Sequence, residues 1–330
     1  MQSLIPTPKD IESTVIPDTP WYTGLTGRMG VSAVRDRLAR ERLLRLNMAP
    51  LFRYPDGLAD RRLFVRILDT LIRCSLLSGR ARRNFETIRR VEREWVLSGL
   101  AKEMDGFRLL QVSDLHLDFD PGTLDRLEQA LETLEYDAVC LTGDFYDLVF
   151  EEESMDLALL DRLVSLFPGP SYAVLGNHDI VAVAEHLERR GVRVLMNESE
   201  WIGRDGAGMV LAGVDDPRQY QTDSIERSLE GRARELPTVL LAHSPQVYRE
   251  ASQFGVDLML SGHTHGGQVA LPGRFTHAKR FKVPRAMVSG AWRFQGLQGY
   301  TSNGCGGCKL PYRINAPAEI SVHTLRAESR

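Results

Sequence analysis

The chain has 330 residues, of which 43% are hydrophobic and 26% charged, so it can bury a large globular core. Its net charge of -3 conceals an asymmetry, because the first 100 residues carry 18 Lys and Arg against 11 Asp and Glu, whereas the rest carry 23 against 33. We expect no secretory signal, no transmembrane helix and no disulfide framework, since no stretch has the required apolar length and only four cysteines are present. A cytoplasmic location follows as an expectation.

The first part of the chain separates into a tail and a basic helical segment. Residues 1–27 are rich in Pro and Thr without any period, so they are predicted to form a flexible N-terminal tail. Residues 28–50 and 58–77 have helical spacing. Arginines surround the apolar face of the second stretch, and Arg80, Arg82 and Arg83 follow it. That apolar face consists of Phe64, Ile67, Leu68, Leu71 and Ile72.

Residues 28–87 therefore form a basic amphipathic helical segment, which has two interpretations. In the first, the helices pack on the main domain and their arginines lie in water. In the second, the segment lies on an anionic membrane surface with its apolar face in the headgroup region. No nucleic-acid partner is expected, because the chain has no recognised nucleic-acid motif and its larger part is acidic.

From about Ile88 onward, short apolar runs alternate with helical stretches, which predicts βαβ units in a largely parallel sheet. The expected strands are Arg108–Ser113, Asp137–Leu141, Ser171–Leu175, Met209–Ala212, Thr238–Ala242 and Asp257–Leu260, with shorter ones at Gly299–Ser302 and Glu319–Thr324. The expected helices are Leu124–Leu134, Met155–Leu166, Val181–Arg190, Asp223–Leu229 and Pro245–Phe254.

Five of these apolar runs end in Asp, Asn or His, and the last ends in Gly-His-Thr-His-Gly. Because functional sites in such folds gather at the carboxyl ends of the strands, these side chains are predicted to meet. Carboxylate, amide and imidazole groups without thiolates suit Mn, Fe or Zn, and seven of them are enough for two ions that share a bridge. The seven candidates are Asp114, His116, Asp144, Asn177, His243, His263 and His265.

The motif order resembles the calcineurin-like metallophosphoesterases, whose pattern is Asp-x-His, Gly-Asp, Gly-Asn-His-Asp/Glu, a lone His and Gly-His-x-His. All five blocks occur here in order, and residues 311–320, Pro-Tyr-Arg-Ile-Asn-Ala-Pro-Ala-Glu-Ile, resemble a late block of a bacterial, membrane-associated branch. The resemblance implies a four-layer αββα sandwich over residues 88–330, carrying the helical, basic N-terminal extension. It also implies a metal-dependent phosphoester hydrolase.

Carried over by motif, the resemblance implies the following roles. One metal ion would be held by Asp114, His116 and His265, the other by Asn177, His243 and His263, with Asp144 bridging the two. A hydroxide between the ions would attack phosphorus in line. His178 would stabilise the phosphoryl oxygens or protonate the leaving group, and Asp179 would orient His178. Mn is the expected metal, and Fe, Zn and Mg also tolerate these ligands.

Several other residues are interpreted less specifically. Asp147 either supports the site in the same manner as Asp179 or is an ordinary loop carboxylate. Cys305 and Cys308 form a lone C-x-x-C among glycines, for which a packing role is favoured over a redox or metal role. His186, His277 and His323 have no motif partners and are interpreted as structural or surface residues.

The substrate is the least constrained part of the prediction. The related bacterial branch usually carries a membrane span, where this chain has its basic helices, so we expect a peripheral enzyme on the cytoplasmic face of a membrane. Some members of the superfamily hydrolyse the pyrophosphate of UDP-2,3-diacylglucosamine in lipid A synthesis, and Arg80, Arg82 and Arg83 could contact such phosphates. The alternatives are a soluble phosphodiesterase for nucleotides or glycerophosphodiesters, and a non-catalytic protein-binding scaffold. The oligomeric state is not predicted.

Overall fold

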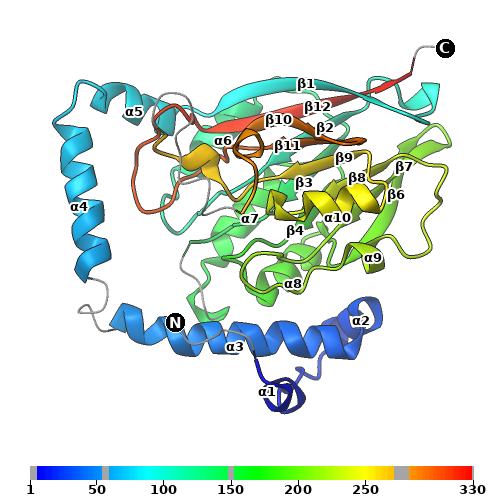
Figure 1. The fold of residues 1–330 in the computed structure, drawn as a ribbon, viewed down its shortest axis with the longest axis horizontal. Coiled ribbons are helices and arrows are strands. Elements are labelled where there is room, and N and C mark those ends of the chain that lie inside the picture. Colours follow the sequence, from blue (N-terminus) through cyan, green and yellow to red (C-terminus); the bar gives the residue numbers. More distant parts are fainter. Residues whose placement is uncertain (1–5, 54–58, 148–151, 271–281, 329–330) are drawn as a thin grey trace.

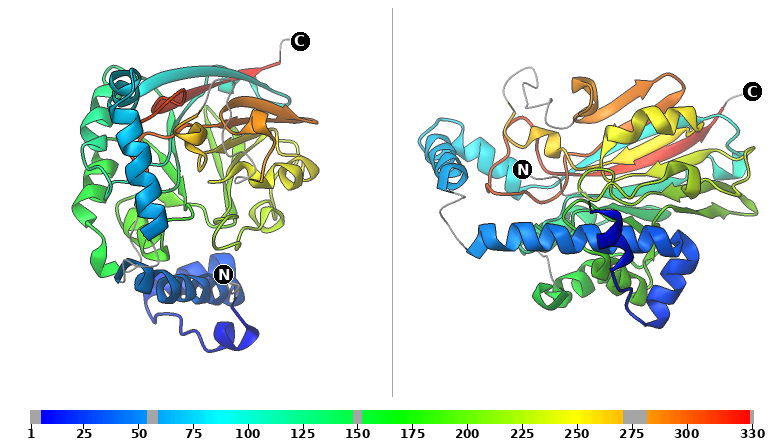
Figure 2. Two further views of the ribbon diagram at one scale, coloured as in Figure 1. Left: turned by 60° about the vertical axis from the view of Figure 1, so that its left-hand side comes forward. Right: turned by 60° about the horizontal axis from the view of Figure 1, so that its bottom comes forward.

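The computed structural model describes residues 6–53, 59–147, 152–270 and 282–328. Two six-stranded sheets pack face to face, and helices cover their outer faces (Figures 1 and 2). The helices are α1 (Pro8–Glu12), α2 (Pro20–Met29), α3 (Val31–Arg53), α4 (Ala59–Arg73), α5 (Ser78–Glu86), α6 (Thr123–Leu131), α7 (Leu157–Ser165), α8 (Val181–Arg189), α9 (Ile225–Ser228) and α10 (Tyr248–Gln253). The strands are β1 (Arg89–Leu97), β2 (Arg108–Val112), β3 (Ala138–Thr142), β4 (Ser171–Val174), β5 (Arg193–Val194), β6 (Glu198–Arg204), β7 (Ala207–Gly213), β8 (Thr238–Leu241), β9 (Leu258–Ser261), β10 (Gly290–Phe294), β11 (Leu297–Thr301) and β12 (Glu319–Ala327).

The first sheet has the strand order β1-β12-β2-β3-β4-β5. Strands β2 to β5 run parallel, and β12 joins β2 in antiparallel register. The second sheet has the order β10-β11-β9-β8-β7-β6, with β7, β8, β9 and β11 parallel. In both sheets, therefore, the carboxyl ends of several parallel strands meet at one edge, where the predicted site residues lie.

Three apolar cores explain the layers. The inner faces of the two sheets meet in one core, which includes Leu109, Leu211 and Leu260. The outer face of the first sheet packs against α6, α7 and α8, and the outer face of the second packs against α9 and α10. A strand that is buried on both faces appears in the sequence as a continuous apolar run, which is why these strands could be located from the sequence. The predicted α/β sandwich is confirmed.

The predicted elements and the observed ones differ mainly at the sheet edges. All eight predicted strands and five predicted helices are present within a few residues of their expected bounds, but β1, β5, β6 and β10 were not predicted. Strand β1 lies at a sheet edge, its first six residues are charged except Val91, and only Trp95 and Leu97 are buried in it. Strand β5 has only two residues. Short or exposed strands lack the apolar run that identifies a buried one.

The N-terminal part differs from the prediction of a flexible tail. Residues 8–12 and 20–29 are helical, and Tyr22, Leu25 and Met29 of α2 are buried in the core beside the first sheet. The side chain of Arg28 binds both carboxylate oxygens of Glu188 on α8, at 2.7 and 2.9 Å. Low periodicity concealed this helix because a ten-residue segment with two glycines and two threonines presents only one narrow apolar stripe.

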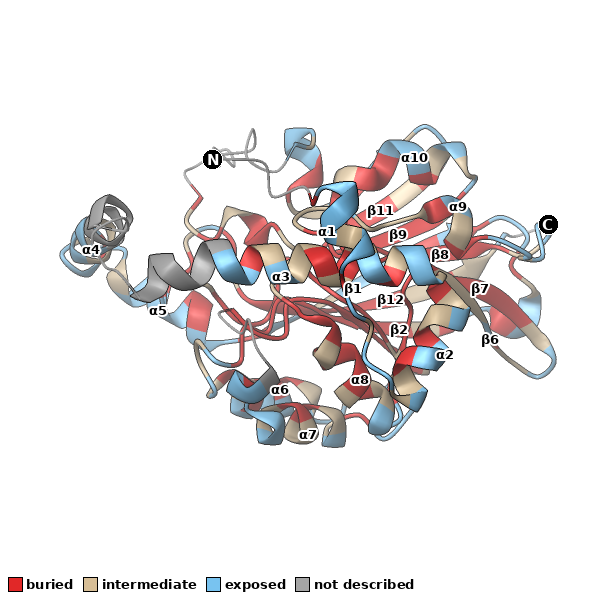
Figure 3. Cartoon of the chain, turned by 90° about the horizontal axis from the view of Figure 1, so that it is seen from below, coloured by how far each residue is buried: buried red, intermediate tan, exposed pale blue. Residues whose placement is uncertain are grey.

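Helices α3, α4 and α5 lie where the sequence predicted a helical segment. Helix α3 runs along the underside of the body in Figure 1, and α4 projects at the periphery, as Figure 3 also shows. The loop before β12 anchors α5, because the amide of Arg313 donates to the carbonyl of Ala81 at 3.0 Å and Asn84 donates to the carbonyl of Arg313 at 3.1 Å. Among the described helices, none combines the length and apolarity needed to cross a bilayer.

Candidate metal centre

Loops that follow β2, β3, β4, β8 and β9 carry the predicted ligands to one place. Backbone hydrogen bonds join these loops to one another: the amide of Asp114 donates to the carbonyl of Gly143 at 2.9 Å, and the amide of Gly262 donates to the carbonyl of His243 at 2.8 Å. Each loop therefore supports its neighbour. The seven candidate ligands lie on these five loops because the parallel strands all end at the same edge.

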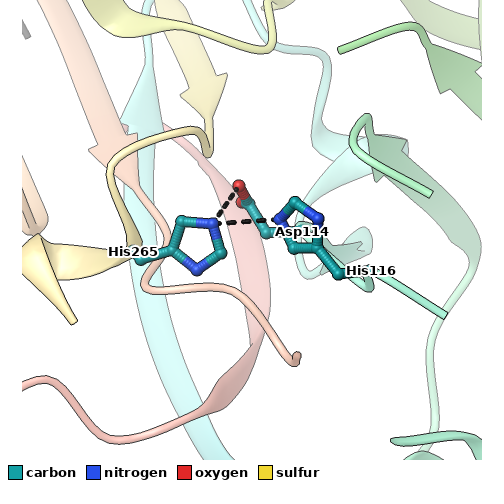
Figure 4. Close-up of side chains that lie close together, drawn as sticks. All are labelled: Asp114, His116 and His265. Carbon is teal, nitrogen blue, oxygen red and sulfur yellow. Dashed lines mark hydrogen bonds and ion pairs between the residues drawn. The ribbon is translucent and has the colours of Figure 1, made fainter. Parts of the chain in front are cut away.

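The first group consists of Asp114, His116 and His265 (Figure 4). Nε2 of His265 lies 3.3 Å from Oδ1 of Asp114 and 3.1 Å from Nε2 of His116. All three side chains are buried. Two imidazole nitrogens and a carboxylate oxygen that converge within hydrogen-bond distance, away from water, form a ready site for a divalent cation.

The second group consists of Asp144, His243 and His263, whose ligand atoms lie within 4.8 Å of one another. Asp144 stands between the two groups, because its Oδ2 lies 3.2 Å from Nε2 of His243 and 3.8 Å from Nε2 of His116. A carboxylate in this position can bind two ions at once, as the predicted bridge requires.

Two buried atoms of the second group give a test of whether a metal fits. Oδ1 of Asn177 and Nε2 of His243 are buried and accept no hydrogen bond within the described chain. Nδ1 of His243 donates to the carbonyl of Thr142 at 2.7 Å, which fixes the tautomer and leaves the Nε2 lone pair directed at Asp144. Buried lone pairs without donors are costly, and a bound cation satisfies them. The residues present fit a dinuclear divalent centre.

The backbone at the ligands is strained in a common way. Five ligands have left-handed φ values between 46° and 70°, although none is a glycine: Asp114, His116, Asp144, His263 and His265. Each such residue costs on the order of 1–3 kcal/mol and persists only where the surrounding structure enforces it. The left-handed turn lets consecutive residues of one loop direct their side chains inward, which an extended strand end cannot do.

Two glycines allow the loops to approach closely. A Cβ atom at Gly176 would collide with Oδ1 of Asp144, and one at Gly262 would collide with the hydroxyl of Ser113 and with Oδ2 of Asp114. The motif glycines before Asn177 and His263 are therefore required by space, since the neighbouring loop carries a ligand carboxylate against each of them.

The electrostatics favour neutral imidazoles at three ligands and an ionised carboxylate at Asp144. Burial lowers the pKa of His116 to about 3, and burial also holds the pKa of His263 and of His265 well below the usual value. Burial opposes ionisation of Asp144, but the neighbouring charges of His243 and His178 outweigh it and hold the pKa of Asp144 well below its usual range. Neutral imidazole and ionised carboxylate are the forms that bind metal ions.

At His243, burial opposes protonation, but the Asp144 carboxylate outweighs it and raises the pKa of His243 to about 10, and burial raises the pKa of Asp114 to about 6. A cation that binds these two groups would displace a proton from each of them.

His178 lies beside the first group without belonging to it. Its ring meets that of His116 edge to face, with centroids 5.4 Å apart, and its side chain is 32% exposed, whereas the three residues of the first group are buried. Nδ1 of His178 donates to the backbone carbonyl of Asp147 at 2.7 Å, so Nε2 is the atom left for a substrate. The amide of His178 donates to Oδ1 of Asp144 at 2.9 Å, which ties this loop to the shared carboxylate.

Asp179 does not have the contacts that the sequence predicted. No hydrogen bond between its carboxylate and the His178 ring occurs in the described structure. The carboxylate instead accepts from the amides of Asp144, Phe145 and Gly176 at 2.7–2.8 Å. The physical reason is that the side chain at this turn points back toward the two loops, where three amides need an acceptor. Asp147, through its carbonyl, orients His178 instead.

The predicted arginines separate into two places. Arg82 lines a cleft of about 870 Å³ between the α4–α5 corner and the loops beyond β2 and β11. Arg80 and Arg83 instead line a smaller hollow of about 320 Å³ together with Arg89, and Arg80 donates to the side chain of Asn315. The larger cleft also contains residues that sequence reasoning missed, namely Arg73, Arg126, Lys309, Phe119 and Tyr312. No motif marks them, because they come from four distant segments.

The remaining cysteines and histidines have structural surroundings. Burial raises the pKa of Cys305 to about 12 and that of Cys308 to about 11, and both are free thiols. The thiol of Cys305 donates to the carbonyl of Glu319 at 3.3 Å. His186 pairs with Asp161 at 2.7 Å, and His323 is buried between Trp95 and Gln111. His277 lies outside the described residues.

The comparisons with known proteins agree with this geometry. Residues 107–267 match the family model described as calcineurin-like phosphoesterase. The chain is 31% identical to the metallophosphoesterase YkuE of Bacillus subtilis strain 168 over 68% of this chain and 80% of that protein. It is 30% identical to a metallophosphoesterase of Helicobacter pylori over 68% and 60%, and 32% identical to a bovine transmembrane protein with a metallophosphoesterase domain over 69% and 55% of the respective chains.

Proposed function

The chain belongs to the calcineurin-like phosphoesterase family, and from this premise we propose that it hydrolyses a phosphodiester or pyrophosphate bond of a membrane lipid. UDP-2,3-diacylglucosamine is the first substrate to test. The coarser statement, that the chain is a metal-dependent phosphoester hydrolase with a dinuclear centre, follows from the family and from the two ligand groups. The lipid and the peripheral position on the cytoplasmic face of a membrane are the proposal.

We assign the metal ligands as follows. Asp114, His116 and His265 would hold one divalent ion, and Asn177, His243 and His263 the other, with Asp144 shared between them. When bound, the ions supply Lewis-acid activation of a water molecule and of the phosphoryl group. Mn is the ion that we propose, and Fe and Zn also suit a mixture of imidazole nitrogens with carboxylate and amide oxygens, without thiolates in the two groups.

His178 would act on the substrate through Nε2, since Nδ1 is engaged with the carbonyl of Asp147. An imidazole in this position can donate a hydrogen bond to the phosphoryl oxygens or a proton to the leaving oxygen. Its partial exposure supports this role, because a substrate can reach the ring from solvent.

The observation that carries the lipid proposal is the cationic cleft together with the apolar corner at its mouth. The cleft adjoins the centre, because Phe119 and Asp120 of its wall follow His116 in the same loop, and the charge of Lys309 acts on Asp147. Arginine and lysine side chains in such a cleft bind phosphate groups. A second phosphate near the dinuclear centre is what a pyrophosphate or a nucleotide-linked substrate would bring.

The apolar corner is formed by α4 and the turn that joins it to α5. Ile67 and Leu71 on α4 are 49% and 62% exposed, and Leu76 in the turn is fully exposed. The adjoining residues Ser78, Gly79 and Arg82 line the cleft, so exposed apolar side chains stand directly beside cationic ones. Apolar and cationic groups at one edge fit an anionic lipid whose acyl chains remain in the bilayer.

The test is an incubation with Mn²⁺ and UDP-2,3-diacylglucosamine in mixed micelles in oxygen-18 water, followed by mass spectrometry. Release of UMP and the acylated sugar phosphate, with the label on one of them, is the expected result. A matched reaction uses a small soluble phosphodiester without acyl chains. Turnover of the soluble ester alone would contradict the lipid proposal and favour the soluble phosphodiesterase. Turnover of neither, in a preparation with both ions bound, would favour the non-catalytic scaffold.

A further inference from the structure

The side chain of Arg37, on helix α3, is fully buried although the helix belongs to the N-terminal extension. Its guanidinium makes two ion pairs and one hydrogen bond. Nε lies 3.0 Å from Oδ2 of Asp215, Nη1 lies 2.9 Å from Oε1 of Glu41, and Nη2 donates to the backbone carbonyl of Asp179 at 2.8 Å. The ring of Tyr220 lies under the guanidinium, with its centroid 3.3 Å from Cζ. An arginine with this many partners is held in one orientation.

Two of these partners, Asp179 and Asp215, lie on loops near the metal centre. Asp179 closes the loop after β4 that carries Asn177 and His178. Asp215 lies in the loop after β7, whose Arg218 is close enough for its charge to act on His263. Arg37 therefore joins the loop that carries Asn177 to the loop after β7.

Asp179 transmits this contact to the shared carboxylate. While its carbonyl accepts from Arg37, its side chain accepts from the amides of Asp144 and Phe145 at 2.8 Å and of Gly176 at 2.7 Å. The residue on one end of the loop thus fixes both the turn that carries Asp144 and the residue that precedes Asn177. A displacement of Asp179 would displace ligands of both ions.

Glu41 makes a second contact one turn further along α3. Its Oε1 accepts from the amide of Val181 at 2.7 Å, at the first residue of α8. The residue before this helix is Ile180, which offers no side-chain cap, so the first turn of α8 receives its acceptor from another helix. Arg37 and Glu41 together hold the segment from Asn177 to Val181 at its middle residue, Asp179, and at its end.

We propose that Arg37 and Glu41 of helix α3 are positioning residues for the loop that carries Asn177 and His178, so that the N-terminal extension is a working part of the metal centre. The inference does not depend on the substrate and goes beyond the proposed lipid hydrolysis. Its physical basis is that a shift of about 1 Å in a reacting group can reduce the rate about 100-fold. Residues that orient metal ligands from outside similarly change metal affinity or activity by about 10–100-fold when they are replaced.

The first experiment compares two Arg→Lys variants of the full chain. Arg37→Lys keeps the positive charge, but a single ammonium group cannot contact all three partners of the guanidinium. Arg28→Lys weakens the anchor of α2 to Glu188, near the far end of α8 from the loop. With a small soluble phosphodiester, kcat of Arg37→Lys is expected to fall about 10–100-fold at a KM within about twofold, whereas kcat of Arg28→Lys is expected to stay within about twofold.

Metal affinity and amide exchange give readouts that do not depend on turnover. The dissociation constant for Mn²⁺, measured by calorimetric titration of the metal-free protein, is expected to rise about tenfold or more in Arg37→Lys and not in Arg28→Lys. Hydrogen exchange followed by mass spectrometry is expected to accelerate in the segments 143–147 and 176–181 of Arg37→Lys. Those segments contain the amides that Asp179 and Glu41 accept from.

A further variant removes the charge cluster without leaving an unpaired buried charge. In the combination Arg37→Met, Glu41→Gln and Asp215→Asn, the fold is expected to persist while metal affinity and kcat fall as in Arg37→Lys. The proposal is overturned if this variant or Arg37→Lys keeps wild-type metal affinity, kcat and exchange. It is also overturned if Arg28→Lys loses kcat and metal affinity to the same extent, because both would then report general loosening of the extension.

Discussion

Helices α3 and α4 are neighbours in the sequence and similar in composition, yet they have opposite surroundings. Both contain an Arg paired with an acid four residues away: Arg37 with Glu41 at 2.9 Å on α3, and Arg73 with Asp69 at 3.0 Å on α4. The side chain of Arg37 is 1% exposed and that of Arg73 is 66% exposed. The same local pairing therefore serves a buried contact in one helix and a solvent-exposed surface in the other.

The difference shows what an amphipathic pattern does and does not specify. Helical spacing determines which residues share a face, but the partner of that face depends on the rest of the chain. Helix α3 packs against loops near the metal centre, so the side chain of Arg37 is buried among its three partners. Among the described side chains of α4, Ile72 packs in an apolar cluster with Leu68 beside it, whereas Ile67 and Leu71 are exposed. Helix α3 thus packs on the main domain, although Arg37 is buried and not in water, and the membrane contact of α4 remains a proposal.

The largest effect on turnover is expected at the metal centre, near the loops that α3 contacts. Asp144→Asn removes the carboxylate between the two ligand groups, so turnover of any phosphoester is expected to be lost while the fold remains. Activity assays together with circular dichroism and metal analysis check this. The variant is expected to bind fewer than two ions per chain, and wild-type turnover would contradict the role of Asp144.

The next effect compares the two arginine pairs directly. Arg37→Ala leaves Asp215 and Glu41 buried without their cation, so the free energy of unfolding is expected to fall by about 3–5 kcal/mol. Arg73→Ala breaks an exposed pair and is expected to leave the urea midpoint unchanged. Equal losses in the two variants would show that burial does not distinguish the helices.

A residue in the inter-sheet region, away from both helices, tests the acid stability of the body itself. Burial lowers the pKa of His323 to about 3, and its ring accepts from Trp95 and contacts Gln111 at 3.0 Å. In the unfolded chain His323 binds a proton below about pH 6.5, whereas in the folded chain it stays neutral down to about pH 3. The free energy of unfolding is therefore not reduced by this residue above pH 6.5. Below it, stability falls by about 1.4 kcal/mol per pH unit until about pH 3.

The check is urea unfolding of the wild type and of His323→Asn between pH 4 and pH 8. The variant is expected to be less stable at pH 8 but to lose less stability on acidification. Parallel curves for the two proteins would show that His323 does not set the acid limit.

The smallest effect on stability is expected on the exposed face of α4. Replacing Leu71 and Leu76 by Ser is expected to change the free energy of unfolding by less than about 0.5 kcal/mol, because both side chains are exposed. Partitioning onto anionic vesicles is expected to fall about tenfold or more, since burial of one such side chain contributes about 1.5–3 kcal/mol. Val96→Ser, on β1 and 52% exposed, is the matched control. Equal partitioning of all three proteins would contradict membrane contact through α4.

The sequence by itself determined the sheet sandwich and the membership of the site. Buried strands are continuous apolar runs, and their carboxyl ends meet at one edge because they are parallel, so residues far apart in the chain could be assigned to one place from local patterns. The late block around Arg313 was also identifiable. The structure adds that Arg313 is buried and donates to the carbonyls of Gly306 and Ala316, which makes this block a support for the loop beside His265.

Only the tertiary structure decided which polar side chains serve the centre from outside. Asp179 directly follows His178 in its motif, whereas Asp147 lies three positions after Asp144. Nevertheless, the turn directs the Asp179 carboxylate to three amides, and the Asp147 carbonyl accepts from His178. Likewise, Arg82 lies in the cleft and Arg80 does not, and Arg37 of a predicted surface helix is buried. Motif spacing is a property of one segment, whereas hydrogen-bond partners and burial depend on segments that pack together from across the chain.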